Sequence, residues 1–333
     1  MRRQTGTFTH ASEADSRAAA QFAAHIQYYL TQSPRQLPSR YLYDPLGSAL
    51  FEAICRLPWY RITRAEERLI AQHGAEVLLR HSTPVSKIVE LGSGSGQKLS
   101  LLLEQRRPGF QPLHVHVVDL SAAALDATVQ ALASAPNVDV TTHLASYEDG
   151  LKAIRENRRN GGRSLVLFLG SNIGNYDRPG ASALVHGLRG QLGAGDGLLL
   201  GTDLVKSERK LLLAYDDPLG VTAAFNLNLL ERINRELGGD FELAAFAHEA
   251  VWNEEESRVE MHLVARSRQE IHIEAAQLTF TMHAGEQIWT ESSYKYRPDD
   301  VRRLVEPAGF GVAAQWIDEE DGFALTLAQA VEP

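Results

Sequence analysis

Strand-like and helix-like segments alternate through the middle of this 333-residue chain, and this alternation limits the possible folds more than any other feature. Short apolar runs typical of buried strands occupy residues 86–91, 114–120, 138–144, 164–169 and 197–204. Between them, apolar residues recur with helical spacing over 98–105, 122–133, 147–155 and 181–192. Because such alternation requires right-handed crossovers, we predict an α/β fold with a Rossmann-like, doubly wound parallel sheet.

The flanking segments have a different pattern, which indicates a second domain. We expect helices at 16–31, 64–79, 208–214, 221–237 and 301–308, and strands at 246–252, 257–266, 277–282, 311–316 and 323–328. Thr63 and Glu66 have the spacing of a capping box before the helix at 64–79. We predict a mobile segment at 1–14, a smaller α+β domain from 15–60 and 206–294, and an α/β domain from 61–205 and 295–333.

Composition and terminal residues exclude several functions. The formal net charge of -9 argues against a nucleic-acid partner, which needs concentrated Lys and Arg. Cys55 is the only cysteine, so the chain forms no intramolecular disulfide, and we interpret it as a buried apolar residue. His114 and His116 have no third ligand nearby, so we expect no metal site. Without an apolar run of membrane-spanning length or a secretory signal, we expect a cytoplasmic protein with no membrane partner.

A glycine-rich segment follows the first strand of the alternating region. It consists of Glu90, Leu91 and the spacing Gly92-x-Gly94-x-Gly96, and a helix containing Lys98 comes next. Glycines permit a tight turn and let the backbone approach a ligand closely. The spacing differs from the Gly-x-Gly-x-x-Gly of dinucleotide enzymes, and no Ser or Thr follows the lysine as in a Walker loop. The ligand therefore need not carry a pyrophosphate.

The second strand ends in Asp119, where a carboxylate can accept hydrogen bonds from both hydroxyls of a ribose. Together, Glu90, the three glycines and Asp119 resemble the first two motifs of the class I methyltransferases. This resemblance implies S-adenosyl-L-methionine (SAM) as the cofactor. An NAD-type enzyme with an altered loop, or a purely structural glycine turn, remains the alternative.

Longer blocks of sequence resemble one particular methyltransferase family. They include Tyr43 to Phe51, Leu57 to Tyr60, Phe168 to Asn175, Tyr215 to Asp217, Gly220 to Asn226 and Thr290 to Tyr296, in the same order. These blocks are distributed from Tyr43 to Tyr296, which spans most of the chain, and they are similar to the histidine Nα-methyltransferases of ergothioneine biosynthesis. The resemblance implies trimethylation of the α-amino group of L-histidine to hercynine, the first step of that pathway. We expect the protein to be a monomer.

The same resemblance implies roles for individual residues. Tyr43, Gly170 and Asn175 would surround the amino and carboxylate groups, with Tyr43 and Asn175 at the reacting nitrogen. The remaining expected substrate contacts are Tyr215 to the carboxylate, Thr222 through water, and Tyr60, Glu291 and Ser293 to the imidazole. On the cofactor side the matching positions are Gly92, Lys98 and Asp119. Where the family carries an acidic residue and phenylalanine against adenine, this chain has Ser146 and Tyr147, and serine is the weaker acceptor.

Simpler interpretations of these residues remain open from the sequence. Tyr60, Trp59 and Phe51 are also typical of an ordinary aromatic core, and Glu291 is also consistent with a surface strand residue paired with Lys295. Two other functions remain open as well: N-methylation of another amino acid such as tryptophan or a derivative, and SAM binding by a non-catalytic regulator. An indole offers one N–H and no acceptor, so the pair Glu291 and Ser293 favours histidine.

Overall fold

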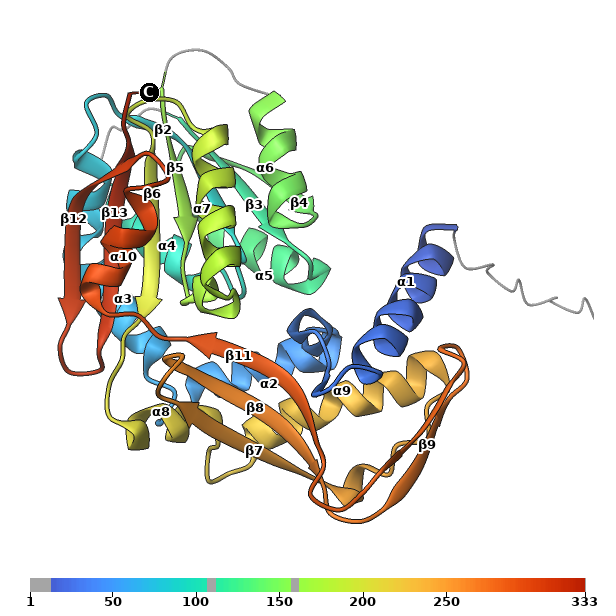
Figure 1. Cartoon of the computed structure of the whole chain (residues 1–333). Helices are drawn as coiled ribbons and strands as arrows, with labels where there is room; N and C mark the ends of the chain where they lie inside the picture. Colours follow the sequence, from blue (N-terminus) through green and yellow to red (C-terminus); the bar gives the residue numbers. More distant parts are fainter. Residues whose placement is uncertain (1–12, 107–111, 157–161, 333) are drawn as a thin grey trace, which may run out of the picture.

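The computed structural model describes residues 13–106, 112–156 and 162–332 of the chain. Its main feature is a seven-stranded sheet, drawn in the upper part of Figure 1. Five strands pair in parallel: β2 (Val85–Leu91), β3 (Leu113–Asp119), β4 (Val138–Leu144), β5 (Arg163–Phe168) and β6 (Gly197–Asp203). The hairpin of β12 (Phe310–Asp318) and β13 (Phe323–Ala330) continues the sheet antiparallel to β6. The order β12-β13-β6-β5-β2-β3-β4 confirms the predicted doubly wound fold.

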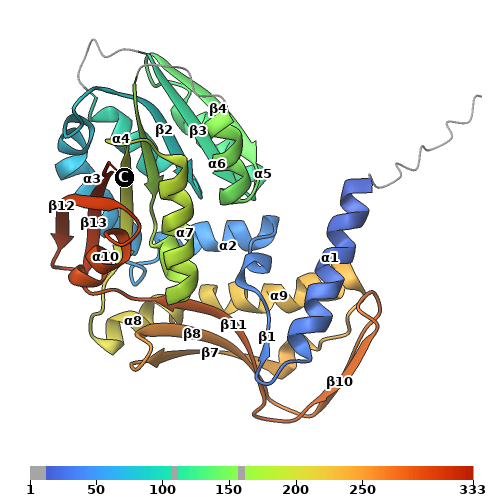
Figure 2. The ribbon, with the colours of Figure 1, turned by 45° about the horizontal axis from the view of Figure 1, so that its top comes forward.

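Helices cover both faces of this sheet (Figure 2). One layer consists of α3 (Ile62–Leu79), α4 (Gln97–Glu104) and α5 (Ala122–Leu132), and the other of α6 (Tyr147–Glu156), α7 (Arg178–Gln191) and α10 (Pro298–Val305). Neighbouring strand residues accordingly enter different hydrophobic clusters: Ile88 packs with the first layer and Val89 with the second. The central strands β5 and β6, which are buried on both faces, have almost continuous apolar sequences, which is why the sequence located them well.

A second sheet of four strands lies near the end of β6, in the lower part of Figure 1. It contains β1 (Arg35–Gln36), β11 (Gln287–Tyr294), β8 (Arg258–Ala265) and β7 (Phe246–Asn253), in that order. The helices α8 (Glu208–Tyr215) and α9 (Val221–Leu237) pack on this sheet, and α2 (Pro45–Arg56) packs on α9. A separate hairpin of β9 (Gln269–Ile273) and β10 (Leu278–Met282) and the helix α1 (Glu13–Leu30) complete this part. The segments before and after the alternating region therefore fold together.

The helix α2 was not predicted, because Pro45 and Gly47 made residues 39–62 look like turns. In the structure Asp44 caps this helix: its Oδ1 accepts the N–H of Gly47 at 2.8 Å, and Pro45 takes the first helical position. Asp44 also accepts from Asn228 and Arg235 of α9, both at 2.7 Å. An aspartate followed by proline is a typical helix start, and that was the signal overlooked.

The predicted capping box of α3 is wrong. The residue before the helix is Arg61, which makes no side-chain cap, and Thr63 lies inside the first turn. Because Thr63 is already helical, its hydroxyl is not at the position that accepts the orphan N–H groups of the first turn. Glu66 is fully buried against the sheet instead, and its partners there belong to the candidate site described below.

Three strands of the structure, β1, β9 and β11, were not predicted, and α10 begins at Pro298 rather than at 301. β11 carries the polar residues Glu291 and Ser293 on one face, so the usual apolar pattern of a half-buried strand is lost.

Helix α1 starts at Glu13, and the rest of the segment expected to be mobile lies outside the described residues. Among the described helices, none combines the length and the apolar character needed to cross a membrane.

Candidate active site

The glycine-rich segment connects β2 to α4 at the centre of the large sheet. There β3 lies on one side of β2 and β5 on the other, so the order of the strands changes direction at β2. Doubly wound sheets bind ligands at the point where the strand order changes direction. Gly92, Gly94 and Gly96 have positive φ angles of 76°, 53° and 72°. A Cβ atom on Gly92 would lie 2.7 Å from both Asn172 Nδ2 and Tyr147 Oη. These positions therefore require glycine for conformation and, at Gly92, for space.

Asp119 ends β3 beside the glycine-rich segment. Its Oδ2 accepts the N–H of Ser93 at 3.0 Å, and its Oδ1 accepts the N–H of Ser121 at 2.8 Å. Burial raises the pKa of Asp119, while the N–H groups of the neighbouring loops oppose the rise. The carboxylate thus shapes the loop and stands at the edge of the sheet where a ribose would bind.

Glu90 is the most unusual group in this region. Only 2% of the residue is exposed, and its Oε2 has no hydrogen-bond partner among the described residues. Burial raises its pKa to about 8; Lys98 opposes this rise, and the nearby carboxylates of Glu66 and Asp119 add to it. A buried acceptor without a donor is costly, unless a ligand supplies the donor or a positive charge. SAM carries a sulfonium and an ammonium group, and these would supply the positive charge and the N–H donor that Glu90 lacks.

Glu66 links the glycine-rich segment to the next loop of the sheet. Both of its oxygens accept the N–H of Gly170, at 2.9 and 2.8 Å, and its Oε2 lies 2.6 Å from Lys98 Nζ. Burial alone would lower the pKa of Lys98, but the charge and hydrogen bond of Glu66 raise it above the usual value. Gly170 has a φ of 73°, and it opens the loop that leads to the short helix η2 (Asn172–Asn175).

A pocket lies between this loop and the smaller sheet. Its lining residues come from widely separated parts of the chain: Tyr43, Phe51, Ile54, Tyr60, Gly170, Ser171, Asn172, Asn175, Ala214, Tyr215, Thr222, Phe225, Met261, Glu291 and Ser293. The loop contacts β11 directly, because a Cβ atom on Gly174 would lie 2.7 Å from the carbonyl oxygen of Tyr294. Every residue expected from the sequence to contact the substrate lines this one pocket.

The pocket combines polar groups with buried aromatic rings. The hydroxyls of Tyr215 and Ser293 are 2.7 Å apart, and Lys295 Nζ lies 2.7 Å from the first and 2.9 Å from the second. Burial raises the pKa of Glu291 to about 7, against the opposing charge of Lys295. Burial also raises the pKa values of Tyr43 and Tyr60 well above 10, so both phenols stay neutral. Neutral phenols can position and relay protons but do not act as strong bases.

One of the simpler interpretations, the surface pair of Glu291 and Lys295, is wrong, whereas the aromatic residues Phe51, Trp59 and Tyr60 do belong to or pack against the core. Glu291 is 8% exposed and Lys295 is 0% exposed, so neither is a surface residue, and Lys295 forms its ion pair with Asp203 at 3.0 Å. Phe51 and Tyr60 are packed against the hydrophobic core, but they also face the pocket. Ser146 donates to Asp149 at 3.0 Å at the start of α6, whereas the Tyr147 hydroxyl lies beside Gly92.

Sequence reasoning missed three polar groups that the fold brings to the site. Glu66 was assigned to a helix cap, Lys295 to a surface pair, and Asn172 was given no role. Glu66 lies four residues after Ile62 and three and four before Leu69 and Ile70, and this helical spacing, which places it on the buried face of α3, was an available signal. No local pattern marks Lys295, because its partners Tyr215 and Asp203 lie far away along the chain. Within the described ranges, no group of three His, Cys, Asp or Glu residues is arranged to hold a metal ion.

The sheet order, the glycine turn at its centre, the acidic residue ending β3 and the unsatisfied Glu90 define a class I SAM-dependent methyltransferase. The profile of the SAM-dependent, histidine-specific methyltransferases matches residues 22–330. This chain belongs to that family.

Three relatives illustrate the similarity. A histidine N-alpha-methyltransferase of Mycobacterium tuberculosis is 41% identical over 300 residues, which is 90% of this chain and 92% of that protein. A histidine N-alpha-methyltransferase of Mycolicibacterium smegmatis is 39% identical over 316 residues, 95% of this chain and 96% of that protein. Ergothioneine biosynthesis protein 1 of Neurospora crassa is 30% identical over 289 residues, 85% of this chain but 32% of that longer protein.

We predict that Glu90→Gln stabilises the cofactor-free protein at alkaline pH. In the unfolded chain this carboxyl ionises near the ordinary glutamate pKa of 4.5, whereas in the folded protein it keeps its proton until about pH 8. The unfolded state therefore loses this proton first, and wild-type stability falls as pH rises through that window. At pH 8 the variant should gain at least about 1 kcal/mol of unfolding free energy, measured by urea titration.

The same substitution should weaken SAM binding about tenfold, because glutamine brings no negative charge to a cationic ligand. Calorimetric titration with SAM at pH 8 measures this loss. A variant that binds SAM like the wild type, or whose stability advantage is the same at pH 5 as at pH 8, would contradict the role given to Glu90.

We also predict that Gly92→Ala lowers the affinity for SAM at least about tenfold, because the new Cβ enters occupied space at a positive φ. Gly190→Ala is the matched control: it lies in α7, and nothing is within 4 Å of its Cβ position. The control should bind SAM normally and be more stable by about 0.5–1 kcal/mol. Equal SAM dissociation constants for the two variants would show that the glycine segment is not the binding loop.

Proposed function

We propose that this protein transfers three methyl groups from SAM to the α-amino nitrogen of L-histidine and forms hercynine, the first step of ergothioneine biosynthesis. One observation carries the proposal: residues from Tyr43 to Ser293 that match the family line a single pocket beside the glycine-rich segment. Asn172 lines this pocket and also faces Gly92, so the acceptor and donor regions share a wall.

Recognition of histidine follows from the types of group in the pocket. A neutral imidazole has one N–H donor and one acceptor nitrogen. In the proposed arrangement Glu291 accepts from the N–H and Ser293 donates to the other nitrogen. Tyr215 donates to the substrate carboxylate, Thr222 lines the pocket, and the aromatic ring of Tyr60 packs beside the imidazole.

Methyl transfer requires orientation more than acid–base chemistry. When bound, SAM supplies the methyl group for an in-line displacement by a neutral amine. An α-amino group has a reference pKa of about 8, so a useful fraction is neutral near pH 7 without a strong base. Tyr43 and Asn175, which both line the pocket, would hold this amine, and the Tyr43 hydroxyl would relay its proton to water. Holding both reactants in line is the main contribution of such a site.

Two alternatives give different outcomes in the same assay. Tryptophan lacks the second ring nitrogen, so in this pocket it would leave the Ser293 donor unpaired, at a cost of about 1–3 kcal/mol. A non-catalytic regulator would bind SAM without turnover. The polar pair on β11 favours histidine over indole, and the complete set of pocket residues favours an enzyme.

The two-domain division predicted from the sequence is part of this proposal. The smaller sheet and its helices come from residues 15–60 and 206–294, and the large sheet from 61–205 and 295–333. SAM would bind in the second group and histidine between the two. All the residues that line the pocket described above belong to this chain, and we propose a monomeric enzyme.

The test is incubation of the purified protein with SAM and each of the twenty amino acids, followed by mass spectrometry. We expect histidine to gain one, two and finally three methyl groups, and tryptophan to gain none under the same conditions. Methylation of tryptophan but not histidine would overturn the substrate. SAM binding without any methylated amino acid would overturn the enzyme and favour the regulator.

We predict that Glu291→Ala raises the KM for histidine at least about tenfold, because it removes a buried acceptor of the ring N–H. SAM affinity should stay unchanged, since Glu291 lies on β11 and not in the glycine-rich segment. Gln287→Ala, an exposed position on the same strand, is the control and should leave both values unchanged. A wild-type KM for Glu291→Ala would rule out this contact.

A further inference from the structure

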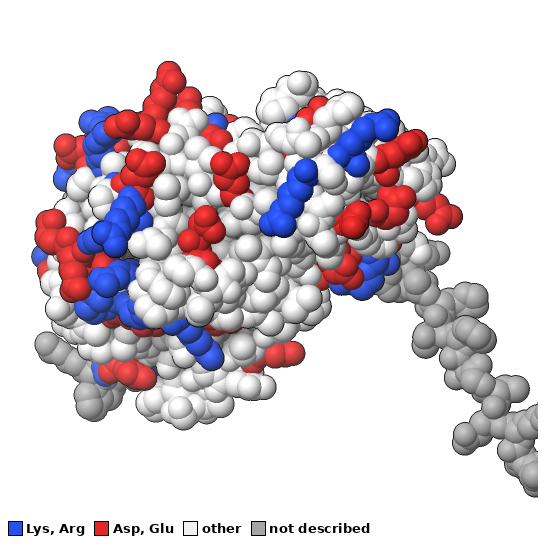
Figure 3. Space-filling model, turned by 90° about the horizontal axis from the view of Figure 1, so that it is seen from below, with Lys and Arg blue, Asp and Glu red and all other residues white. Residues whose placement is uncertain are grey.

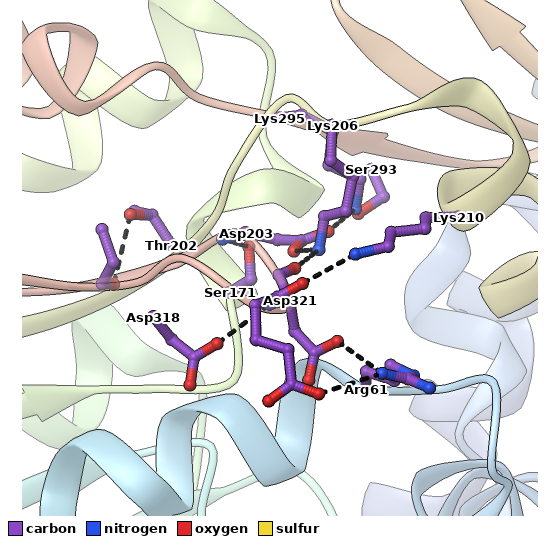
Figure 4. A network of polar contacts seen from close by, with 12 residues as sticks. Arg61, Ser171, Thr202, Asp203, Lys206, Lys210, Ser293, Lys295, Asp318 and Asp321 are labelled. Carbon is purple, nitrogen blue, oxygen red and sulfur yellow. Dashed lines mark hydrogen bonds and ion pairs between the residues drawn. The ribbon is translucent and has the colours of Figure 1, made fainter.

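Lys295 is a completely buried lysine beside the substrate pocket, immediately after β11. Its Nζ lies 2.7 Å from the hydroxyl of Tyr215. It also lies 3.0 Å from Asp203 Oδ2 and 2.9 Å from the hydroxyl of Ser293 (Figure 4). The three ammonium hydrogens therefore each have a partner. Burial opposes the positive charge, but Tyr215 and Asp203 keep the pKa of Lys295 above its usual value. The group is a permanent cation at neutral pH.

A lysine ammonium can donate hydrogen bonds but cannot accept them. The hydroxyl oxygens of Tyr215 and Ser293 must therefore be acceptors toward Lys295, and each hydroxyl keeps its own hydrogen for another partner. Without a ligand, one of these hydrogens serves the 2.7 Å bond between the two hydroxyls. Both hydrogens become available to a ligand that offers two acceptors. The lysine thus makes this wall of the pocket a donor surface.

We propose that Lys295, held by Asp203, is a positioning residue that sets the Tyr215 and Ser293 hydroxyls as hydrogen-bond donors to the amino-acid substrate. Tyr215 donates to the carboxylate and Ser293 to the acceptor nitrogen of a neutral imidazole. This assignment rests on the proposed function. It adds a cause for selectivity: an oriented donor penalises a ring that has no acceptor nitrogen, such as indole.

The strand geometry explains why a residue outside the pocket lining can act in this way. Glu291, Ser293 and Lys295 are two positions apart, so their side chains lie on the same side of the chain. Glu291 supplies the acceptor for the imidazole and Ser293 the donor, with the lysine behind the donor. Without Lys295, the Ser293 hydroxyl is free to accept as well as donate, and the distinction between the two ring nitrogens weakens.

Asp203 ends β6 and fixes the lysine from the side of the large sheet. Its Oδ1 lies 2.5 Å from Lys206 Nζ, and its N–H donates to Ser171 Oγ at 2.9 Å (Figure 4). Lys206 also donates to the carbonyl oxygen of Asp321 at 2.5 Å, and Asp321 lies in the turn between β12 and β13. Asp203 therefore holds two lysines, of which only Lys295 contacts the pocket hydroxyls. Lys206 is a matched control.

The experiment compares Lys295→Met with Lys206→Met in the full-length protein, using histidine and SAM as substrates. Methionine keeps most of the side-chain length and removes the charge. For Lys295→Met we expect the KM for histidine to rise about tenfold or more, with kcat reduced less than about threefold. The SAM dissociation constant should stay within about twofold, because no SAM-site contact changes. Lys206→Met should leave the KM for histidine unchanged.

A double-mutant cycle provides the readout that a merely structural role would not produce. In a Ser293→Ala background, Lys295→Met should raise the KM for histidine much less than it does alone, because the oriented donor is already absent. If Lys295→Met does not fold, Asp203→Asn combined with Lys295→Met removes both buried charges and takes its place. The same rise in KM for Lys206→Met, or full additivity with Ser293→Ala, would overturn the inference.

The two proposals fail in different ways. A wild-type protein that does not methylate histidine refutes the proposed function before any variant is compared. A wild-type protein that methylates histidine, together with a folded Lys295→Met variant of normal KM, refutes only the positioning role. Methylation of tryptophan by Lys295→Met, under conditions in which the wild type methylates none, would support the selectivity part directly.

Discussion

The buried carboxylate of Glu66 holds together the parts of this protein on which both ligand sites depend. It pairs with Lys98 from α4 and accepts the N–H of Gly170 from the loop after β5. A carboxylate with no exposed surface is stable only because a charge and a backbone donor compensate for its lost hydration. The glycine-rich segment and the pocket loop are thereby tied to one carboxylate on α3.

Around this anchor the site is built from groups that are costly to bury. Glu90 and Glu291 retain protons far above the usual range, with pKa values of about 8 and about 7, because burial disfavours their charged forms. A protein normally avoids such groups unless a ligand supplies their partners. In the proposed complex Glu90 would face the cationic donor, and Glu291 would face the imidazole. These two carboxyl groups lower the stability of the ligand-free protein, and the two ligands that the site is proposed to hold would supply their missing partners.

Charge is distributed differently over the surface and in the interior. On the face seen from below, Lys and Arg side chains lie among Asp and Glu side chains, which is an ordinary solvated surface (Figure 3). In the interior, by contrast, Asp203 and Lys295 form a pair that is 1% and 0% exposed. Surface pairs contribute little to stability or specificity, whereas a buried pair with satisfied hydrogen bonds fixes the orientation of its neighbours. The proposed recognition of the substrate therefore depends on the interior charges.

The sequence by itself determined the α/β alternation and the glycine-rich segment with its acidic neighbours, and the resemblance of long blocks determined the family. These features depend on the local periodicity of apolar residues or on a local turn, and a short stretch of sequence contains the whole of either signal. The tertiary structure decided the rest: Glu66 does not cap a helix but joins two loops, and Lys295 does not pair with Glu291 but with Asp203 and two hydroxyls. Such partners are far apart in the sequence and meet only when the two sheets pack, because hydrogen bonds and ion pairs depend on distance in space rather than along the chain.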